Sequence, residues 1–149
     1  MSVSKYVSDI KIIQQNNEVV YNYLSDFKNL SVFFNEYTLA QLSQQIPNTK
    51  ITSFECDFDS CRFTLSNSGE AGIRIIERES PKTIKLTGTG KIPFDMFVWI
   101  QILPLSEYQS KIRVTLHADL NMMMKMVAGK KMSEGVNKIA EALAHLPYR

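Results

Sequence analysis

Glu77 is the residue whose type and setting best suit acid–base chemistry in this sequence. It alternates along a strand-like segment with Ile73 and Ile75, and residues two apart in a strand share a face. A carboxylate turned inward beside apolar side chains has a raised pKa and can serve as an acid, a base or a ligand anchor. The residues favour the alternative, in which Glu77 ends the strand in solvent or pairs with Lys82 or Lys85.

His117 and Asp119 form a second candidate pair, because a histidine beside an aspartate can act as a general base. They alternate with an apolar set on the same strand, and so we expect both on the outer, solvated face. Tyr23 ranks far behind Glu77 as an acid or base inside the protein. We therefore assign no catalytic residue and favour a protein that is not an enzyme.

Two cysteines, Cys56 and Cys61, flank a tight turn around Asp59 and Ser60. Free buried thiols are the favoured interpretation, because cysteine is among the most buried residue types and the cytoplasm disfavours disulfides. A cross-strand disulfide is the alternative. Two cysteines without a nearby histidine cannot complete a zinc site, and residues 88–90 lack the Lys-Ser/Thr ending of a phosphate loop. We expect neither a metal nor a cofactor.

Composition and charge place the chain among ordinary globular proteins. Its 149 residues are 44% hydrophobic and 21% charged, with a net charge of +2, which fits a single domain over residues 1–149. So balanced a charge gives no argument for nucleic acid as a partner. No apolar run approaches the roughly 18–20 residues that span a bilayer, and no signal-peptide block opens the chain. We expect a cytoplasmic protein without a transmembrane segment.

The first third of the chain indicates one strand and then short helices. The strand covers about residues 5–14, and Asn16 or Asn17 is the expected N-cap of a helix whose apolar residues continue to Phe27. Further helical segments are expected over residues 28–37 and 39–45.

From residue 50 the hydrophobic period changes to two, which indicates strands joined by tight turns. The expected strands cover residues 51–58, 61–67, 71–78, 83–90, 94–103 and 112–120. Consecutive strands on short turns are antiparallel neighbours. Together with the N-terminal strand they predict a curved antiparallel sheet of about seven strands.

A long helix closes the chain. Asn121 is its expected N-cap and Pro147 follows its end, so that it is roughly 35 Å long and crosses a small sheet. A stripe of apolar and small residues, which we expect to be buried against the sheet, follows the helical period. It contains Met122, Met126, Gly129, Met132, Ser133, Val136, Ala140 and Leu143. Gly129 costs about 1 kcal/mol relative to alanine, and so it serves either a close approach to the sheet or room for a ligand.

This order of elements is similar to that of the helix-grip superfamily, which includes START lipid-transfer domains, birch-pollen-allergen-like proteins and polyketide cyclase/dehydrase-like proteins. The resemblance covers nearly the whole chain. Its motifs are the first strand leading into residues 17–20, residues 72–77 followed by 81–84, and the last helix running into residues 146–148. It implies an α+β fold in which the sheet grips the last helix, often around an apolar cavity. It carries over no catalytic residue.

Such a cavity would hold a small hydrophobic ligand, either a lipid or an aromatic, polyketide-like molecule. Its expected lining is Phe54, Phe63, Ile75, Glu77, Leu86, Met96, Val98, Leu116, Met126, Gly129, Met132 and Val136. Five of the seven methionines lie between residues 122 and 132, where they suit either varied apolar ligands or plain core filling. Non-catalytic binding or transport is the favoured function, and a cyclase- or dehydrase-type enzyme with a cavity carboxylate is an alternative.

The strand over residues 94–103 is apolar on both faces, and only one of its rows can face the helix. The second row contains Phe97 and Trp99. An exposed aromatic row indicates contact with a partner or with a second copy in a homodimer, which makes a partner-binding module without a ligand the third hypothesis. The alternative is that a bulge or the N-terminal helices cover this row.

Overall fold

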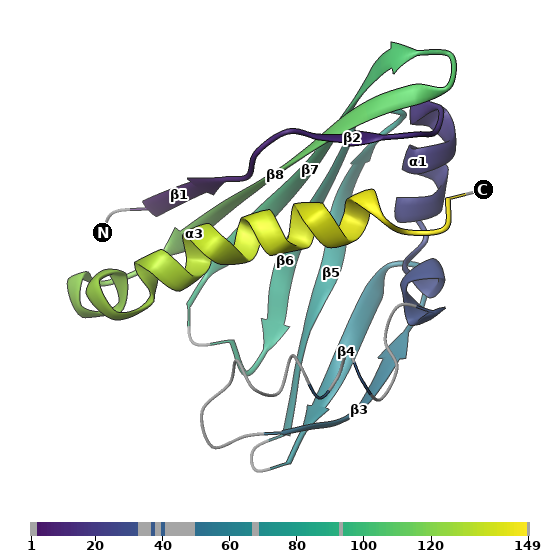
Figure 1. Cartoon of the computed structure of the whole chain (residues 1–149). Helices are drawn as coiled ribbons and strands as arrows, with labels where there is room; N and C mark the ends of the chain where they lie inside the picture. The colour runs from purple at the N-terminus through teal and green to yellow at the C-terminus, as the bar shows by residue number, and fades with distance from the viewer. Residues whose placement is uncertain are drawn as a thin grey trace.

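The computed structural model describes residues 3–32, 37, 40, 50–66, 69–92 and 94–148. One antiparallel sheet of eight strands carries a long helix across one of its faces (Figure 1). The predicted α+β architecture, a curved antiparallel sheet with a long C-terminal helix, is confirmed. The sheet has one strand more than expected because the first predicted strand is divided in two.

The two parts of that strand are β1 (Val3–Val7) and β2 (Lys11–Ile13), and both pair with β8 (Gln109–Asp119). Between them the N–H of Ser8 donates to the carbonyl of Val114 at 2.8 Å, and the Ser8 hydroxyl accepts from the N–H of Val114 at 2.9 Å. A side-chain hydroxyl thus takes the place of a backbone carbonyl in the ladder. The chain therefore keeps its place beside β8 while regular strand pairing is interrupted.

α1 (Asn17–Leu24) begins where the sequence predicts, because the side-chain oxygen of Asn16 accepts a hydrogen bond from the N–H of Glu18 at 2.8 Å. A short 3-10 helix, η1 (Phe27–Val32), follows it. The predictions that lie wholly or partly outside the described residues are the helical segments over residues 28–37 and 39–45.

The remaining strands are antiparallel neighbours. They are β3 (Ile51–Cys56), β4 (Ser60–Leu65), β5 (Gly69–Glu79), β6 (Thr83–Gly90) and β7 (Met96–Ser106). The order across the sheet is β1-β8-β7-β6-β5-β4-β3, with β2 also beside β8. The N-terminal strands therefore lie next to the last strand and alongside the helix that follows it (Figure 1).

A bulge in β5 reverses the inward and outward alternation of its second half. The register passes from Ile75 opposite Leu86 to Glu77 opposite Lys85, which leaves Ile76 as the extra residue. Glu77 consequently lies on the outer face of the sheet and is exposed. The interpretation that places Glu77 inward with Ile75 is wrong, because strict alternation does not hold across the bulge.

Cys56 and Cys61 form a disulfide between β3 and β4. The two residues are direct cross-strand partners, so their side chains leave the hairpin on the same face. The favoured prediction of two free thiols is wrong for this reason, and the alternative of a cross-strand disulfide holds.

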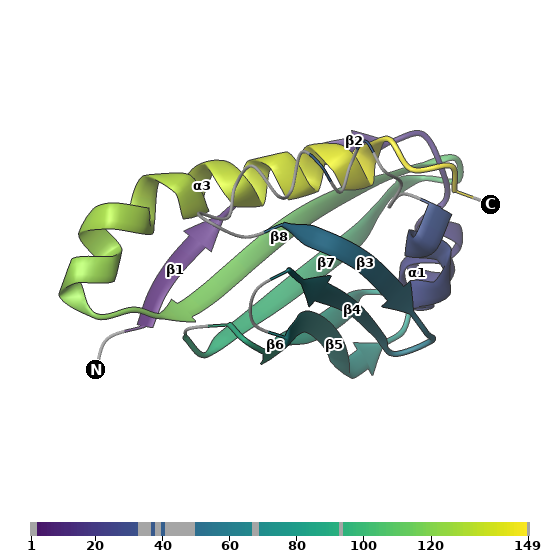
Figure 2. The same cartoon turned by 90° about the horizontal axis from the view of Figure 1, so that it is seen from below.

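The last helix, α3 (Met122–Ala144), is capped as predicted by Asn121, whose side-chain oxygen accepts from the N–H of Met124 at 2.9 Å. Its C-terminal half is buried on the sheet. Its N-terminal half is not: Met122 is 79% and Met126 82% exposed. The prediction that these two methionines belong to a buried stripe is wrong, because the first turns of α3 project past the ends of β1 and β8 (Figures 1 and 2).

Candidate functional site

The two halves of α3 separate two regions on the inner face of the sheet. At one end, α1, the C-terminal half of α3 and the strands beneath them form a dense core, which we call the closed end. Its central side chains are fully or almost fully buried, and they include Val20, Leu24, Phe27, Ile84, Ile102, Ile112, Val114, Val136 and Ala140. This end supplies most of the stability, since burying one such side chain contributes about 1.5–3 kcal/mol.

The other region, which we call the open end, lies on the inner face and extends from β8, which contacts α3, across to β3 at the opposite edge of the sheet. Its apolar side chains are half-buried, and they are Phe54, Phe63, Ile73, Met96 and Leu116. All of them except Phe54 pack against the core. They come from five different strands of one face. The open end is therefore an apolar surface that continues from the core without being closed to the same degree.

Two glycines at the open end show how its space is used. A Cβ on Gly88 would lie 2.7 Å from Cδ1 of Ile92 and 3.1 Å from Cγ of Met96, so these side chains fill the space over that glycine. A Cβ on Gly129 would meet, among the described residues, only the hydroxyl of Tyr6 at 3.5 Å, which is ordinary contact. Close approach of the helix backbone to the sheet therefore does not account for Gly129.

The twelve predicted lining residues fall into three groups. Buried in the core are Ile75, Leu86, Val98 and Val136. Half-buried around the open end or on the adjoining half of α3 are Phe54, Phe63, Met96, Leu116, Gly129 and Met132. Away from the inner face are Glu77 and Met126. The sequence missed Tyr6, whose pairing with Leu116 places it on the inner face, and the alternation in its strand was the available signal.

Arg78 is the charged residue that the bulge turns inward in place of Glu77. Its guanidinium donates to the carbonyl oxygens of Ser25 (2.8 and 3.0 Å) and Phe58 (2.9 Å) and to the carboxylate of Asp59 (2.8 Å). These bonds tie β5 to the end of α1 and to the β3–β4 turn. All described partners of this cation are therefore structural, and it does not reach the open end.

Tyr23, the weaker acid–base candidate, belongs to the closed end. Its hydroxyl donates to the carbonyl of Asn29 at 3.3 Å, and its ring lies edge-on to Tyr148 with centroids 5.1 Å apart. The hydroxyl of Tyr148 donates to the carbonyl of Leu143 at 2.5 Å, and burial raises the pKa of Tyr148. These phenols anchor the end of α3 within the closed end.

The outer face carries a cluster of Lys85, Phe97, Trp99 and His117, which we call the outer cluster. The rings of Trp99 and His117 meet edge-on at 4.5 Å, and the Lys85 ammonium lies 4.8 Å from the ring of Phe97 and 5.1 Å from that of Trp99. Phe97 remains 39% exposed. His117 is on the outer face as predicted, although it is half-buried against Trp99.

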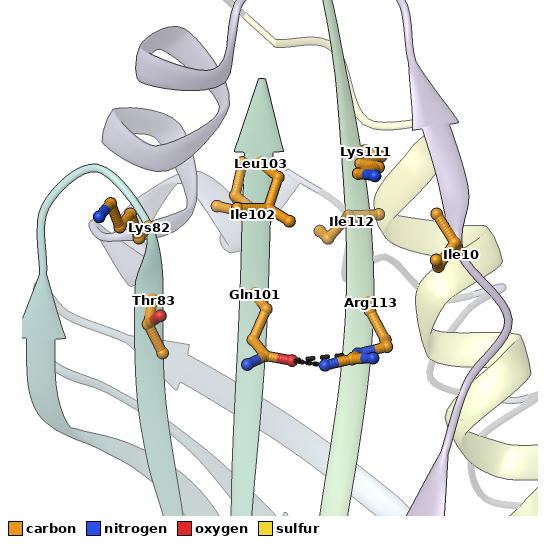
Figure 3. A pocket seen from close by; sticks show the side chains of 9 residues that line it. All are labelled: Ile10, Lys82, Thr83, Gln101, Ile102, Leu103, Lys111, Ile112 and Arg113. Atoms are coloured by element: carbon orange, nitrogen blue, oxygen red, sulfur yellow. Dashed lines mark hydrogen bonds between the residues drawn. The ribbon is translucent and has the colours of Figure 1, made fainter. Parts of the chain in front are cut away.

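Two adjoining hollows extend from this cluster. The larger, of about 430 Å³, is lined by Ile10, Lys82, Thr83, Gln101, Ile102, Leu103, Lys111, Ile112 and Arg113 (Figure 3). Its charged residues are all cations, and Gln101 accepts two hydrogen bonds from Arg113 at 2.7 and 3.0 Å. The smaller, of about 240 Å³, is lined by Glu77, Glu79, Thr83, Lys85, Trp99 and Gln101. The outer face is thus basic on one side and acidic on the other.

In the described ranges, no three His, Cys, Asp or Glu side chains converge as metal ligands. Within the same ranges, no helix combines the length and apolar character needed to cross a membrane.

Solved structures show the same fold. Norcoclaurine synthase from Thalictrum flavum, in complex with dopamine and hydroxybenzaldehyde, gives a TM-score of 0.65 at 11% identity over 97% of this chain and 86% of that one. A protein from Thermobifida fusca gives 0.57 at 13% identity over 97% and 96%. The di-domain ARO/CYC BexL from the BE-7585A biosynthetic pathway gives 0.64 at 13% identity over 98% of this chain and 46% of that one.

No family model matches the sequence, and no curated protein matches it. At identities this low the structural likeness establishes the fold, and the predicted helix-grip fold is confirmed.

Proposed function

We propose that this protein binds a small hydrophobic ligand at the open end, on the inner face of the sheet. One observation carries the proposal: the five apolar side chains of the open end are only half-buried, while their neighbours on the same sheet face are fully buried. A ligand that covered them would remove apolar surface from water at about 25 cal/mol per Å². Norcoclaurine synthase, which shares the fold, is known with dopamine and hydroxybenzaldehyde bound.

The polar groups near the open end limit the chemistry of the ligand. On the described strands, no carboxylate or histidine shares the inner face. The Tyr6 hydroxyl beside Gly129 can offer one hydrogen bond. A lipid or an aromatic molecule with at most one polar group therefore fits better than a charged metabolite.

The same inventory supports non-catalytic binding or transport as the proposed role. The cyclase- or dehydrase-type alternative depended on a carboxylate in the cavity, and Glu77 lies on the outer face. The shared fold does not transfer the activity of a synthase or cyclase to this chain. A cytoplasmic location stays a prediction from the sequence.

Native mass spectrometry of the purified protein tests the proposal. We expect an adduct of apolar character that organic extraction releases, and we expect Leu116→Trp to reduce it because the larger ring occupies the open end. Thr64→Trp, on an exposed position of β4, is the matched control and should retain the adduct. A purified protein that carries no adduct and does not bind added fatty acids or aromatic probes would contradict the proposal.

A second candidate function is recognition of a second copy through the outer face, and a pattern of charge favours it. Glu79, Thr83, Gln101 and Arg113 are successive partners across β5, β6, β7 and β8, so one row runs from an acid to a base. Two such faces related by a two-fold axis along the strands would bring each acid opposite the other copy's base. The outer cluster would lie within the same contact.

Charge exchange tests this dimer. Glu79 and Arg113 are three strands apart, about 14 Å at ordinary strand spacing, and so they do not pair within one chain. We expect Glu79→Arg and Arg113→Glu each to shift the sedimentation coefficient from dimer to monomer, and the double exchange to restore the dimer. A wild-type chain that is monomeric at every concentration would rule the dimer out.

A further inference from the structure

The first two turns of α3 carry the most exposed large apolar side chains of the described chain. Met122, Met123, Met126 and Val127 are 79%, 75%, 82% and 76% exposed. At 3.6 residues per turn, positions 122, 123, 126 and 127 fall within an arc of about 140° around the helix. Large apolar side chains gathered at this level of exposure mark an interaction site in a soluble protein.

Charge next to these side chains has a single sign along the helix. Lys130 and Lys131 follow in the next turn, and residues 121–133 contain no acidic residue. The first turn of a helix normally favours acidic side chains, and α3 has none there. Glu134 marks the far limit of the basic stretch. In the sheet, Asp119 is the last residue of β8, and its N–H donates to the carbonyl of Asp95, which precedes β7.

Shape distinguishes between possible partners. The first turns of α3 project beyond the ends of β1 and β8, so the patch is a convex tip (Figures 1 and 2). A stable protein contact buries about 800 Å² on each partner, which is more than four side chains on two helical turns can offer. A bilayer interface accepts a convex apolar element without a complementary groove, and lysines beside it attract anionic headgroups.

We propose that this tip, made of Met122, Met123, Met126, Val127, Lys130 and Lys131, docks the protein on an anionic lipid surface. The apolar side chains enter the boundary between headgroups and acyl chains, and the two ammonium groups remain among the phosphates. Docking at this place brings Gly129 and the open end to the bilayer. That consequence rests on the proposed ligand function, whereas docking itself does not.

Sedimentation with vesicles of phosphatidylcholine, with and without phosphatidylglycerol, tests the proposal on the full chain. We expect binding only to the anionic vesicles and a loss of binding at high salt. Met123→Ser combined with Met126→Ser should abolish it, and both positions are too exposed for the change to disturb the core. Lys130→Gln and Lys131→Gln should each weaken binding roughly five-fold.

Two controls match these variants. Lys138→Gln removes a lysine from a later turn of the same helix, and Leu105→Ser with Tyr108→Ser removes two exposed apolar side chains from the β7–β8 hairpin. Both should bind like wild type. Equal loss in the controls, or no binding to anionic vesicles, overturns the proposal.

Analytical ultracentrifugation covers the competing outcome. Suppose that the wild type self-associates but does not bind vesicles, and that the double variant Met123→Ser with Met126→Ser is monomeric. This result would identify the tip as a protein contact and overturn membrane docking. Native mass spectrometry of the same double variant distinguishes membrane docking from ligand binding at the open end. A variant that no longer binds vesicles but keeps the apolar adduct would show that the ligand site does not depend on docking.

Discussion

The closed and open ends share one sheet and one helix but differ in how completely they are packed. At the closed end Val136 and Ala140 of α3 are 1% and 0% exposed, and Leu24 of α1 is 0% exposed. At the open end Met96 and Leu116 are half-buried, and the adjoining first turns of α3 project into solvent. The same helical stripe is thus core in one half and surface in the other.

This difference separates stability from binding within one small fold. A dense end holds the sheet and helix in register, so the other end can keep apolar surface available without unfolding the chain. Interiors that are packed densely tolerate little change in volume, whereas a half-buried surface accepts a ligand or a truncated side chain at lower cost. Substitutions at the closed end should therefore mainly lower stability, and substitutions at the open end should mainly change ligand binding.

The largest expected effect comes from the same truncation made at each end. We expect Leu24→Ala to lower the free energy of unfolding by about 3–4 kcal/mol, because it leaves a cavity in a closed core. Leu116→Ala should cost only about 1 kcal/mol, because its side chain is half-buried and its site is already partly open. Urea unfolding followed by the fluorescence of Trp99, the single tryptophan, measures both.

Equal losses at the two positions would remove the distinction between the ends. The slope of the unfolding transition serves as a check, since an altered slope would point to a change in the denatured state.

Much of this fold could be predicted because its signals are local. The side chains of Asn16 and Asn121 cap α1 and α3 where expected, and alternation of apolar residues locates the strands. The order of short-turn strands then leaves little choice of topology. The disulfide was open to prediction only as an alternative, because sequence fixes neither the register nor the redox setting of Cys56 and Cys61.

The candidate site was harder to predict, for two physical reasons. Ile75 and Ile76 are both apolar, and so the alternation contains no sign of the bulge that sends Glu77 outward. A helical wheel shows which residues share a stripe, but it does not show where the sheet beneath them ends. Met126 is exposed because its part of α3 lies beyond the end of the sheet, which the helical wheel cannot show.

The second effect, of intermediate size, sharpens the account of the closed end. Tyr148→Phe removes the hydroxyl that donates to the carbonyl of Leu143 and should cost about 1 kcal/mol at neutral pH. Burial raises the pKa of Tyr148 above its ordinary value of 10.0. The wild type therefore keeps this contribution below pH 10 and loses it as the pH rises further.

We expect the stability difference between Tyr148→Phe and wild type to shrink above pH 10. Thermal unfolding followed by circular dichroism over that range measures it, with Tyr108→Phe, at a ring that is 72% exposed, as the control. A constant difference at alkaline pH would contradict the buried placement of the phenol.

The smallest expected effect on stability concerns the ion pair that joins β2 to α3. The Lys11 ammonium of β2 lies 2.9 Å from the carboxylate of Glu141 in α3, and this hydrogen bond, with the accompanying charge, lowers the pKa of Glu141. Both groups are substantially solvent-exposed, and exposed ion pairs contribute little. A carboxyl with a lowered pKa stabilises the fold above its usual value of 4.5, and that contribution is lost as the pH falls through the lowered value.

Lys11→Met should therefore make the loss of thermal stability between neutral and acid pH shallower than in wild type. It should not abolish that loss, because His145 also lowers the pKa of Glu141. Lys138→Met, an exposed lysine on the same helix, should leave the acid profile unchanged. If both variants lose stability in acid as steeply as wild type, then contacts other than the Lys11–Glu141 pair hold β2 to α3. One such contact is the 2.7 Å hydrogen bond from the N–H of Asp9, just before β2, to the side chain of Asn137.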